Sequence, residues 1–494
     1  TVIAYNLNAN LSVKEEPFTF TLGGNLGGAD NNTRAETDRT DRLAGEPAGY
    51  FFQTGESDNE RLNGGGRAGV EWNVTNRNTL SSSVSFHRRN YESDDDQTFS
   101  NRDAAGNETS YGRQVNTSQN SGNEARAQVG FRRRSPKEGK EWTSDVTWNR
   151  SERANSSDFT TWTYGSEGTD LPRVQHNTGS TGSDQLTLQL DAQDPLNAGN
   201  KLDWGLRGSW RQELSVLDVT LSDSTGADRY DSTLSNRYDV TDVVNAAYVN
   251  WSHKLGERWS VMAGFRVELT DLTAELPTKG ERYTYRYPDG TNDLGKALFP
   301  SVYLSRKWEG ARELQLNVSR KISRPNFFQV MPFIMFSDSR SYRVGNPALG
   351  PELTWIAEVN HLLPIGNPRN NWLTSVFTKY TSGVITGYVY PLADDPGVLV
   401  STFVNGDDSW TYGWDNTLKI EPRKDMQITV GATLQFVEVG LGSIGARNSG
   451  WWVNGKLNVS QRFAKDWTVQ LNGEYEGDRP IPQGHSLPQY GMDA

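Results

Sequence analysis

Short polar turns return about every 55 to 60 residues along this chain, and they constrain its fold more than any other feature. Each turn lies between two stretches of roughly 10 to 15 residues in which apolar and polar side chains alternate, and longer polar segments separate these pairs. The nine turns are residues 13–17, 75–78, 136–140, 194–197, 255–258, 309–312, 366–369, 422–425 and 464–466. This rhythm is typical of an all-β fold, a transmembrane antiparallel up-and-down β-barrel.

The alternation assigns a face to each strand residue, because successive side chains of a strand point to opposite sides of the sheet. The side chains predicted to face lipid are Met426, Ile428, Val430, Leu434 and Phe436, with Val261, Phe265, Val267 and Leu269. Those predicted to face the lumen are Thr429, Gln435, Arg266 and Glu268. A soluble β-sandwich also alternates, but its strands are shorter and its turns recur every 8 to 12 residues or so.

Tryptophan marks the edges of five of the turns. An indole ring is apolar with one N–H group to hydrate, so it prefers a membrane–water interface. We therefore predict a periplasmic aromatic girdle made by Trp142, Trp259, Trp308, Trp372 and Trp467. This placement favours the barrel over a soluble β-rich binding protein or glycosidase.

Composition is compatible with a membrane protein that crosses with strands. Only 34% of the residues are hydrophobic, and no run of about 18 apolar residues exists for a helical span. A barrel strand needs apolar residues on one face only. Because no linker interrupts the turn rhythm, we predict a single barrel domain over residues 1–494.

Several function classes are disfavoured by what the sequence contains. The chain has no Cys, and its net charge of −11 argues against nucleic acid as a partner. The five His are far apart, and no catalytic or phosphate-binding motif occurs, so we predict no enzyme activity, no cofactor and no metal site. The acidic run 92–96 is predicted to lie in a loop, where it is either solvated or a calcium site.

Nine turns imply eighteen strands, and residues 486–494 read as the opening of another, so we expect about 18–19 strands. The strands before the turns are expected near 1–12, 63–74, 122–135, 182–193, 240–254, 294–308, 353–364, 401–421 and 448–463. Their partners are expected to begin near residues 18, 79, 141, 199, 258, 312, 371, 426 and 467.

One region resembles a known family. Residues 323–326 read S-R-P-N at the end of a strand, and residues 345–352 read G-N-P-A-L-G-P-E at the start of the next. This pair resembles the barrel of TonB-dependent outer-membrane receptors, in the outer-membrane β-barrel family, where S-R-P is followed by G-N-P-x-L-x-P-E. The matching residues are Arg324, Pro325, Gly345, Asn346, Pro347, Pro351 and Glu352. Their role is either structural, since Pro and Gly fix backbone geometry, or direct contact with substrate.

The resemblance implies location in the outer membrane and active uptake of a scarce nutrient, namely a siderophore, carbohydrate or peptide. Its partners would be outer-membrane lipid and lipopolysaccharide, TonB, the small nutrient and, in some such receptors, a surface lipoprotein. It also implies a plug domain and a TonB-contacting segment before residue 1 and about three strands after residue 494, for about 22 strands when complete. The alternative is a passive porin, or a non-transporting scaffold or adhesin barrel, without a plug.

A hydrophobic segment follows the S-R-P motif. Its members are Phe327, Phe328, Met331, Phe333, Met335 and Phe336. So many apolar side chains would not be left in water. The segment is therefore either a loop packed on its neighbours over the barrel rim or a hydrophobic lip that contacts substrate outside the cell.

Overall fold

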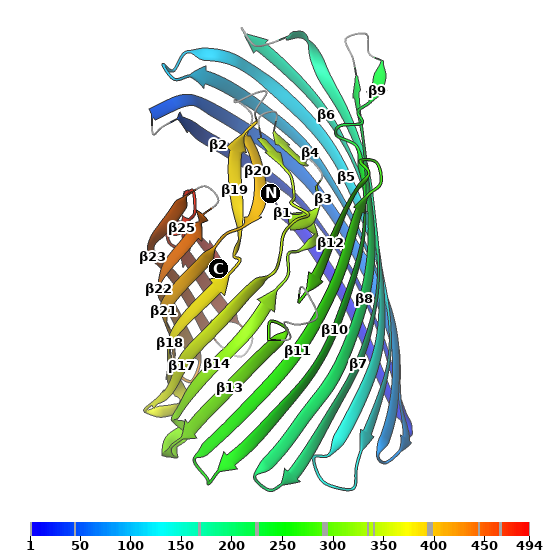
Figure 1. Ribbon diagram of the computed structural model, residues 1–494, viewed down its shortest axis with the longest axis vertical. Coiled ribbons are helices and arrows are strands. Elements are labelled where there is room, and N and C mark those ends of the chain that lie inside the picture. The colour runs from blue at the N-terminus through cyan, green and yellow to red at the C-terminus, as the bar shows by residue number, and fades with distance from the viewer. Residues whose placement is uncertain are drawn as a thin grey trace.

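The structure is a computed structural model that describes most of the chain. The described residues are 2–43, 46–165, 169–222, 227–288, 295–332, 335–338, 341–392, 399–442, 445–463 and 467–493. Long antiparallel strands curve into a barrel wall (Figure 1). No helix among these residues is long and apolar enough to span a membrane.

The wall is a 21-stranded sheet in which each main strand pairs with the next main strand along the chain. In spatial order the main strands are β1 (Val2–Glu15), β2 (Phe18–Leu43), β3 (Glu46–Thr75), β4 (Asn78–Asp103), β5 (Glu108–Arg134), β6 (Glu141–Gly165), β7 (Thr169–Asn197), β8 (Asn200–Ser222), β10 (Asn236–Leu255), β11 (Trp259–Leu276), β13 (Leu298–Lys307), β14 (Glu313–Ser323), β17 (Glu352–Ile365), β18 (Asn367–Ser382), β21 (Asp408–Arg423), β22 (Met426–Leu441), β23 (Ala446–Arg462), β24 (Thr468–Glu476) and β27 (Gln489–Asp493). The short strands β9 (Asp228–Tyr230) and β12 (Glu281–Tyr287) pair with the far ends of β8 and β11. The predicted up-and-down sheet of about 18–19 strands is confirmed.

Among the described residues no pairing joins β27 back to β1, so the wall is open between these two strands (Figure 1). All other neighbouring main strands in the wall pair in antiparallel ladders, several of which contain a register shift. In lipid, an unpaired strand edge leaves backbone groups without hydrogen bonds.

The predicted short turns join consecutive strands at one end of the wall, the lower end in Figure 1. The turn 464–466 lies outside the described residues, although β23 and β24 on either side of it pair with each other. Local chemistry sets these turns. The Thr75 hydroxyl accepts hydrogen bonds from the backbone N–H groups of Arg77 and Asn78, and Gly256 adopts a φ of 71° that favours glycine. The short 3-10 turn η1 (Glu309–Ala311) connects β13 to β14.

Strand lengths differ from those predicted. β2 to β8 each contain 23 to 30 residues rather than 10 to 15, because the polar segments between the pairs continue the same ladders beyond the membrane. The acidic run Glu92 to Asp96 was therefore wrongly assigned to a loop, since it lies in β4. The predicted strand 401–421 is two elements, β20 (Leu399–Asn405) and β21, separated at residues 406–407.

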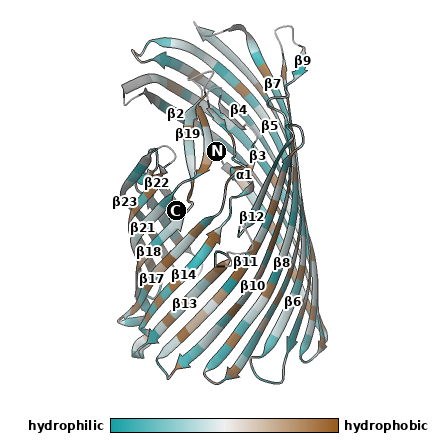
Figure 2. Ribbon diagram, viewed as in Figure 1, coloured by the Kyte–Doolittle hydropathy of each residue, from teal (hydrophilic) through white to brown (hydrophobic). Residues whose placement is uncertain are grey.

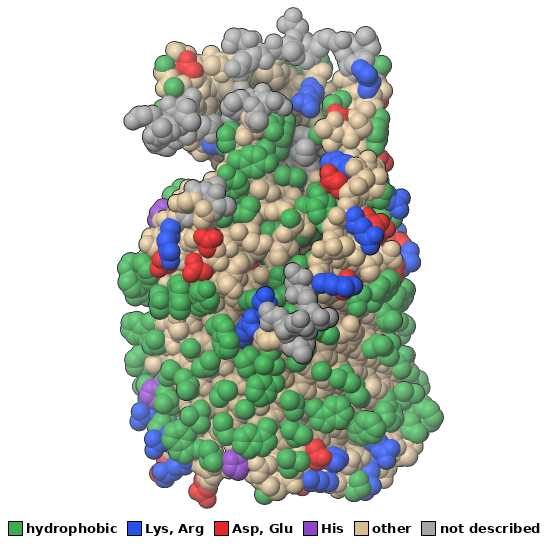
Figure 3. Space-filling model, in the orientation of Figure 1, with side chains coloured by type: hydrophobic (Ala, Val, Ile, Leu, Met, Phe, Trp, Pro, Cys, Tyr) green, Lys and Arg blue, Asp and Glu red, His purple; other side chains and the backbone are tan. Residues whose placement is uncertain are grey.

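Hydrophobic and hydrophilic residues alternate along the strands (Figure 2), and the apolar side chains form a belt on the outer face of the wall, in the half nearer the short turns (Figure 3). Val430 is 40% exposed and Phe265 52% exposed, whereas Gln435 and Glu268 are each 7% exposed on the opposite face. The predicted alternation therefore has its apolar residues outside and its polar residues inside. Above the belt the outer face becomes polar (Figure 3).

The long connections build smaller structures at the other end. The loop after β14 contains the single helical turn α1 (Phe327–Val330), β15 (Met335–Asp338) and β16 (Ser341–Arg343). β16 pairs in parallel with β20, whose hairpin partner is β19 (Ile385–Pro391), so two loops share one four-stranded sheet. A third loop forms the hairpin of β25 (Arg479–Ile481) and β26 (Gly484–Ser486).

Candidate functional site

Arg324, the arginine of the S-R-P motif, ties the end of β14 to the inner face of β11. Its guanidinium donates to the Glu268 carboxylate at 2.5 Å and to the Thr270 hydroxyl at 2.8 Å. Arg266 donates to the other Glu268 oxygen at 2.5 Å. Glu268 is thus a buried carboxylate held between two arginines, which is the arrangement that makes burial of a charge tolerable. The contact between Arg324 and Glu268 holds the start of the following loop against the inner wall.

We call residues 324–351 the motif loop and residues 383–407 the hairpin loop. Gly345 and Asn346 fasten the motif loop to itself. The Gly345 N–H donates to the Met331 carbonyl at 2.9 Å, and the Asn346 N–H donates to the Gln329 carbonyl at 2.7 Å. A Cβ at position 345 would lie well inside 3.0 Å of the Met331 backbone, so this contact requires glycine.

The same motif joins the two loops. The Asn346 side chain donates to the Phe403 carbonyl at 2.9 Å, and the Val344 N–H donates to the Ser401 carbonyl at 2.9 Å. Asn405 reciprocates from the hairpin loop, accepting from the Gly350 N–H at 2.7 Å and donating to the Gly350 carbonyl at 3.0 Å.

Glu352 ends the motif by bridging to the hairpin loop, where its carboxylate accepts from the Ile385 N–H at 2.6 Å. Pro325, Pro347 and Pro351 lie in the segments between these contacts, where their fixed φ suits irregular backbone. In this structure the motif residues contact protein, which favours the structural interpretation of the motif. We use the term loop knot for the hydrogen bonds made by Val344, Gly345, Asn346, Gly350 and Glu352.

A third loop also contacts the hairpin loop. The Gln483 side chain accepts from the Val389 N–H at 2.7 Å and donates to the Val389 carbonyl at 3.0 Å. The amide therefore continues the edge of β19 as one further strand residue would. Three connections that are far apart in the sequence thus form one hydrogen-bonded structure at the long-loop end.

The hydrophobic segment divides between two environments. Met331 is 7% exposed and packs with Val330 in a cluster that includes Tyr238 and Leu276 on the inner faces of β10 and β11. Phe328 is 54% exposed. Phe333 lies outside the described residues, and the side chains of Phe327, Met335 and Phe336 are likewise outside what the structure describes. Met331 thus fits the packed-loop interpretation, and a substrate contact by Phe328 stays a prediction.

The five predicted girdle tryptophans lie at the short-turn end. Trp142, Trp259 and Trp372 are strand residues of β6, β11 and β18, whereas Trp308 precedes η1 and Trp467 precedes β24. Trp142, Trp259, Trp372 and Trp467 are each at least 36% exposed. Trp308 is half-buried because two guanidinium groups stack on it, those of Arg306 at 4.6 Å and Arg312 at 4.9 Å from the ring centre. Their function as a membrane girdle stays a prediction.

Sequence reasoning missed a second set of exposed aromatic residues at the upper border of the belt. Trp148 on β6 and Trp210 on β8 both pair with Leu186 of β7, so they lie at one level, and each is 39% exposed. The sequence contains a signal for this second level. Among the outward-facing positions of each strand, Trp148 is followed by the charged Arg150 and Trp210 by the polar Gln212. Two such levels are what the two interfaces of a membrane would require.

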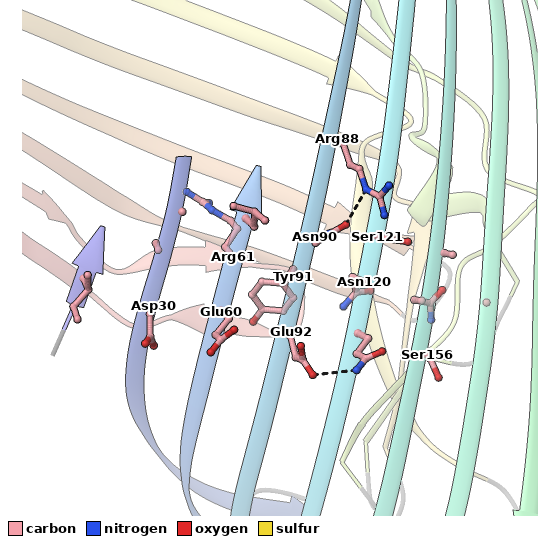
Figure 4. Close-up of a pocket in the computed structure, with 18 of the residues that line it drawn as sticks. Asp30, Glu60, Arg61, Arg88, Asn90, Tyr91, Glu92, Asn120, Ser121 and Ser156 are labelled. Carbon is pink, nitrogen blue, oxygen red and sulfur yellow. Dashed lines mark hydrogen bonds between the residues drawn. The ribbon is translucent and has the colours of Figure 1, made fainter. Parts of the chain in front are cut away.

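A hollow of about 830 Å³ lies on the wall above the belt, across β1 to β7 (Figure 4). Asp30, Glu60 and Glu92 face one another across three strands in it. Glu92 shares its face of β4 with Phe86, which is exposed, so this acidic row opens outward rather than into the lumen. Within the described part of the chain, no three His, Cys, Asp or Glu residues are placed to hold a metal ion.

Arginines on this outer wall pair with carboxylates. The Arg113 guanidinium lies 2.5 Å from the Asp96 carboxylate, and its hydrogen bond holds the pKa of Asp96 below its usual value. Arg150 lies 2.7 Å from the Glu152 carboxylate. The charges of these two outer arginines are therefore neutralised by neighbouring carboxylates.

An antiparallel wall with an apolar outer belt, aromatic residues at both of its borders and a polar inner face defines an outer-membrane β-barrel. The profile of the outer membrane protein beta-barrel family matches residues 133–494, and the chain belongs to that family. A comparison with curated protein sequences found no match.

Solved structures share the fold at low sequence identity. A variant of the ferric enterobactin receptor of Pseudomonas aeruginosa is 14% identical, with a TM-score of 0.55 over 99% of this chain and 68% of its own. The ferripyoverdine receptor of the outer membrane of the same organism, bound to ferripyoverdine, is 11% identical, with a TM-score of 0.53 over 99% of this chain and 63% of its own. The chain thus spans about two thirds of these receptors and has their fold.

Proposed function

We propose that this chain is the barrel portion of a TonB-dependent outer-membrane receptor that captures a scarce nutrient and carries it into the periplasm. The observation that carries the proposal is the use of the matching motif residues: Arg324 of S-R-P anchors the motif loop to the inner wall, and the G-N-P-x-L-x-P-E residues form the loop knot. The receptor-like fold supports it at the level of architecture.

The described residues supply the parts that stay fixed during transport. Glu268 and its two arginines anchor the motif loop to the inner wall, and the loop knot links that loop to the hairpin loop. A pre-organised mouth of this kind can bind ligand without first ordering its loops, which lowers the entropic cost of binding. Around the wall, the belt contacts outer-membrane lipid and lipopolysaccharide.

The remaining parts belong to the full-length protein. A barrel of about 22 strands has a lumen too wide to select a nutrient unless a plug fills it. In the proposal a plug closes the lumen, TonB pulls on the plug from the periplasm, and further strands pair with the edges of β27 and β1. Siderophores, carbohydrates and peptides all remain candidate nutrients, and we propose no enzyme activity.

Conductance of the full-length protein in planar lipid bilayers tests this proposal against a passive porin. We expect no steady open-channel current, because a plugged lumen leaves no continuous aqueous path. Heat-modifiable mobility on gels would first verify that the protein is folded. Stable current steps of the size that open porins give would then contradict the proposal.

A further inference from the structure

Unpaired arginines gather on the inner face of the wall, just above the level of the belt. Cross-strand register places Arg89 of β4 opposite Gly122 of β5, and Gly122 opposite Arg153 of β6. One row further from the membrane, Arg61 of β3 lies opposite Tyr91. Because Leu62 and Phe86 are exposed on the outer face, these odd-numbered residues of β3 and β4 point inward.

Amide side chains complete the same part of the wall. Tyr91 continues in register to Asn120 and then to Asn155. The Tyr91 hydroxyl donates to Asn59, which also lies on the inner face, so its ring is held against the wall. We call Arg61, Arg89, Arg153, Tyr91, Asn120 and Asn155 the inner arginine patch.

Gly122 leaves open space at the centre of this patch. Adjacent strands are about 4.8 Å apart, so Arg89 and Arg153 rise from backbones about 10 Å apart with no side chain between them. The nearest atom to a Cβ built at Gly122 would be Cγ of Arg153, at 3.7 Å. Two guanidinium groups can therefore converge above the glycine on one small ligand.

The three arginines of the inner patch are not neutralised by a direct ion pair within the described part of the chain. Arg61, Arg89 and Arg153 are exposed and form no hydrogen bond or ion pair with any residue that the structure describes. Glu213 interacts electrostatically with Arg153 across the inner face, but the two side chains form no ion pair. On the outer face of the same strands, Arg113 and Arg150 are paired and the row Asp30, Glu60, Glu92 is acidic. In a chain of net charge −11, these three arginines thus form a local cationic site on the inner wall.

We propose that the inner arginine patch is a binding site for a small polyanion, a ligand with two or more carboxylate, sulfonate, phosphate or catecholate groups, at the outer mouth of the lumen. This inference rests on the proposed uptake function. It narrows the substrate of that function to anionic compounds and excludes neutral carbohydrates. Guanidinium groups bind such oxyanions through paired N–H donors, while Asn120 and Asn155 supply neutral donors beside them.

Equilibrium binding to purified full-length protein tests the site without requiring transport. The probe is the fluorescent trisulfonate pyranine, followed by fluorescence anisotropy in detergent at low ionic strength. We expect wild-type binding that weakens with added salt, and at least about a tenfold loss of affinity in Arg89→Gln/Arg153→Gln. Gly122→Val, which fills the gap and leaves every charge in place, should also lose at least about fivefold.

Arg88→Gln is the matched control, because Arg88 is the neighbour of Arg89 on the opposite face of β4 and donates to Asn90 there. It should bind pyranine within about twofold of wild type. The inference would be overturned if wild-type protein did not bind pyranine, or if Arg88→Gln lost as much affinity as Arg89→Gln/Arg153→Gln. It would also be overturned if the double variant kept its affinity, as it would if a segment of the full-length protein covered the patch. Open-channel conductance with intact pyranine binding would instead reject the uptake proposal alone.

Discussion

Val430→Arg should lower the free energy of unfolding of the barrel by about 2–4 kcal/mol. Val430 lies near the middle of the lipid-facing residues of β22 and is 40% exposed on the outer belt. A guanidinium group at this position would lie in the hydrocarbon of the bilayer without water or a carboxylate partner, and its desolvation has a large free-energy cost. The measurement is urea-induced unfolding of full-length protein refolded into phospholipid vesicles.

Thr429→Arg is the control for this prediction, since Thr429 precedes Val430 and points to the polar inner face. We expect a change of less than about 1 kcal/mol, because an arginine there can reach water in the lumen. If Thr429→Arg unfolded the barrel while Val430→Arg left it unchanged, the assignment of the two faces would be inverted.

Gly345→Val should release the motif loop and the hairpin loop from each other. No side-chain rotation can relieve a Cβ that collides with the Met331 backbone, so the contact must open. Four backbone and side-chain hydrogen bonds depend on this geometry, two within the motif loop and two to the hairpin loop. At about 0.5–1.5 kcal/mol each, their loss should total roughly 2 kcal/mol or more.

Hydrogen exchange measures this effect locally. We expect amide protection in residues 343–350 and 399–405 to fall at least about 30-fold, while the strands of the belt keep theirs. Gly350→Ala is the matched control on the same loop, because the nearest atom to its added Cβ would be 3.7 Å away on Asn405. Equal loss of protection in both variants would show that Gly345 has no special part in the loop knot.

The wall was predictable because its two determinants are local. Alternation along a single strand, as from Met426 to Phe436, already fixes which face is apolar, and a short turn such as 255–258 fixes which strands pair. In lipid the sheet must then close on itself, because a free strand edge leaves backbone groups without hydrogen bonds.

The features that were predicted wrongly or not predicted depend on contacts with residues far away in the sequence. Whether the polar run 92–96 is loop or strand is decided by the ladders that β3 and β5 offer it, which no local pattern reveals. Arg324 finds Glu268 across 56 residues, and Asn346 finds Phe403 across 57. The motif marked the right residues, but only the fold shows that they fasten one loop to another.

We propose that transport through this barrel is energised through TonB, and accumulation of nutrient by cells tests this most directly. Uptake of radiolabelled iron chelates, oligosaccharides and peptides would be compared in the source bacterium with the gene intact, with the gene deleted and with tonB deleted. We expect at least one compound to accumulate only when both genes are intact, and deletion of both genes to reduce its uptake no further than either single deletion. Accumulation that requires this gene but proceeds equally without tonB would contradict the account and leave a passive barrel in its place.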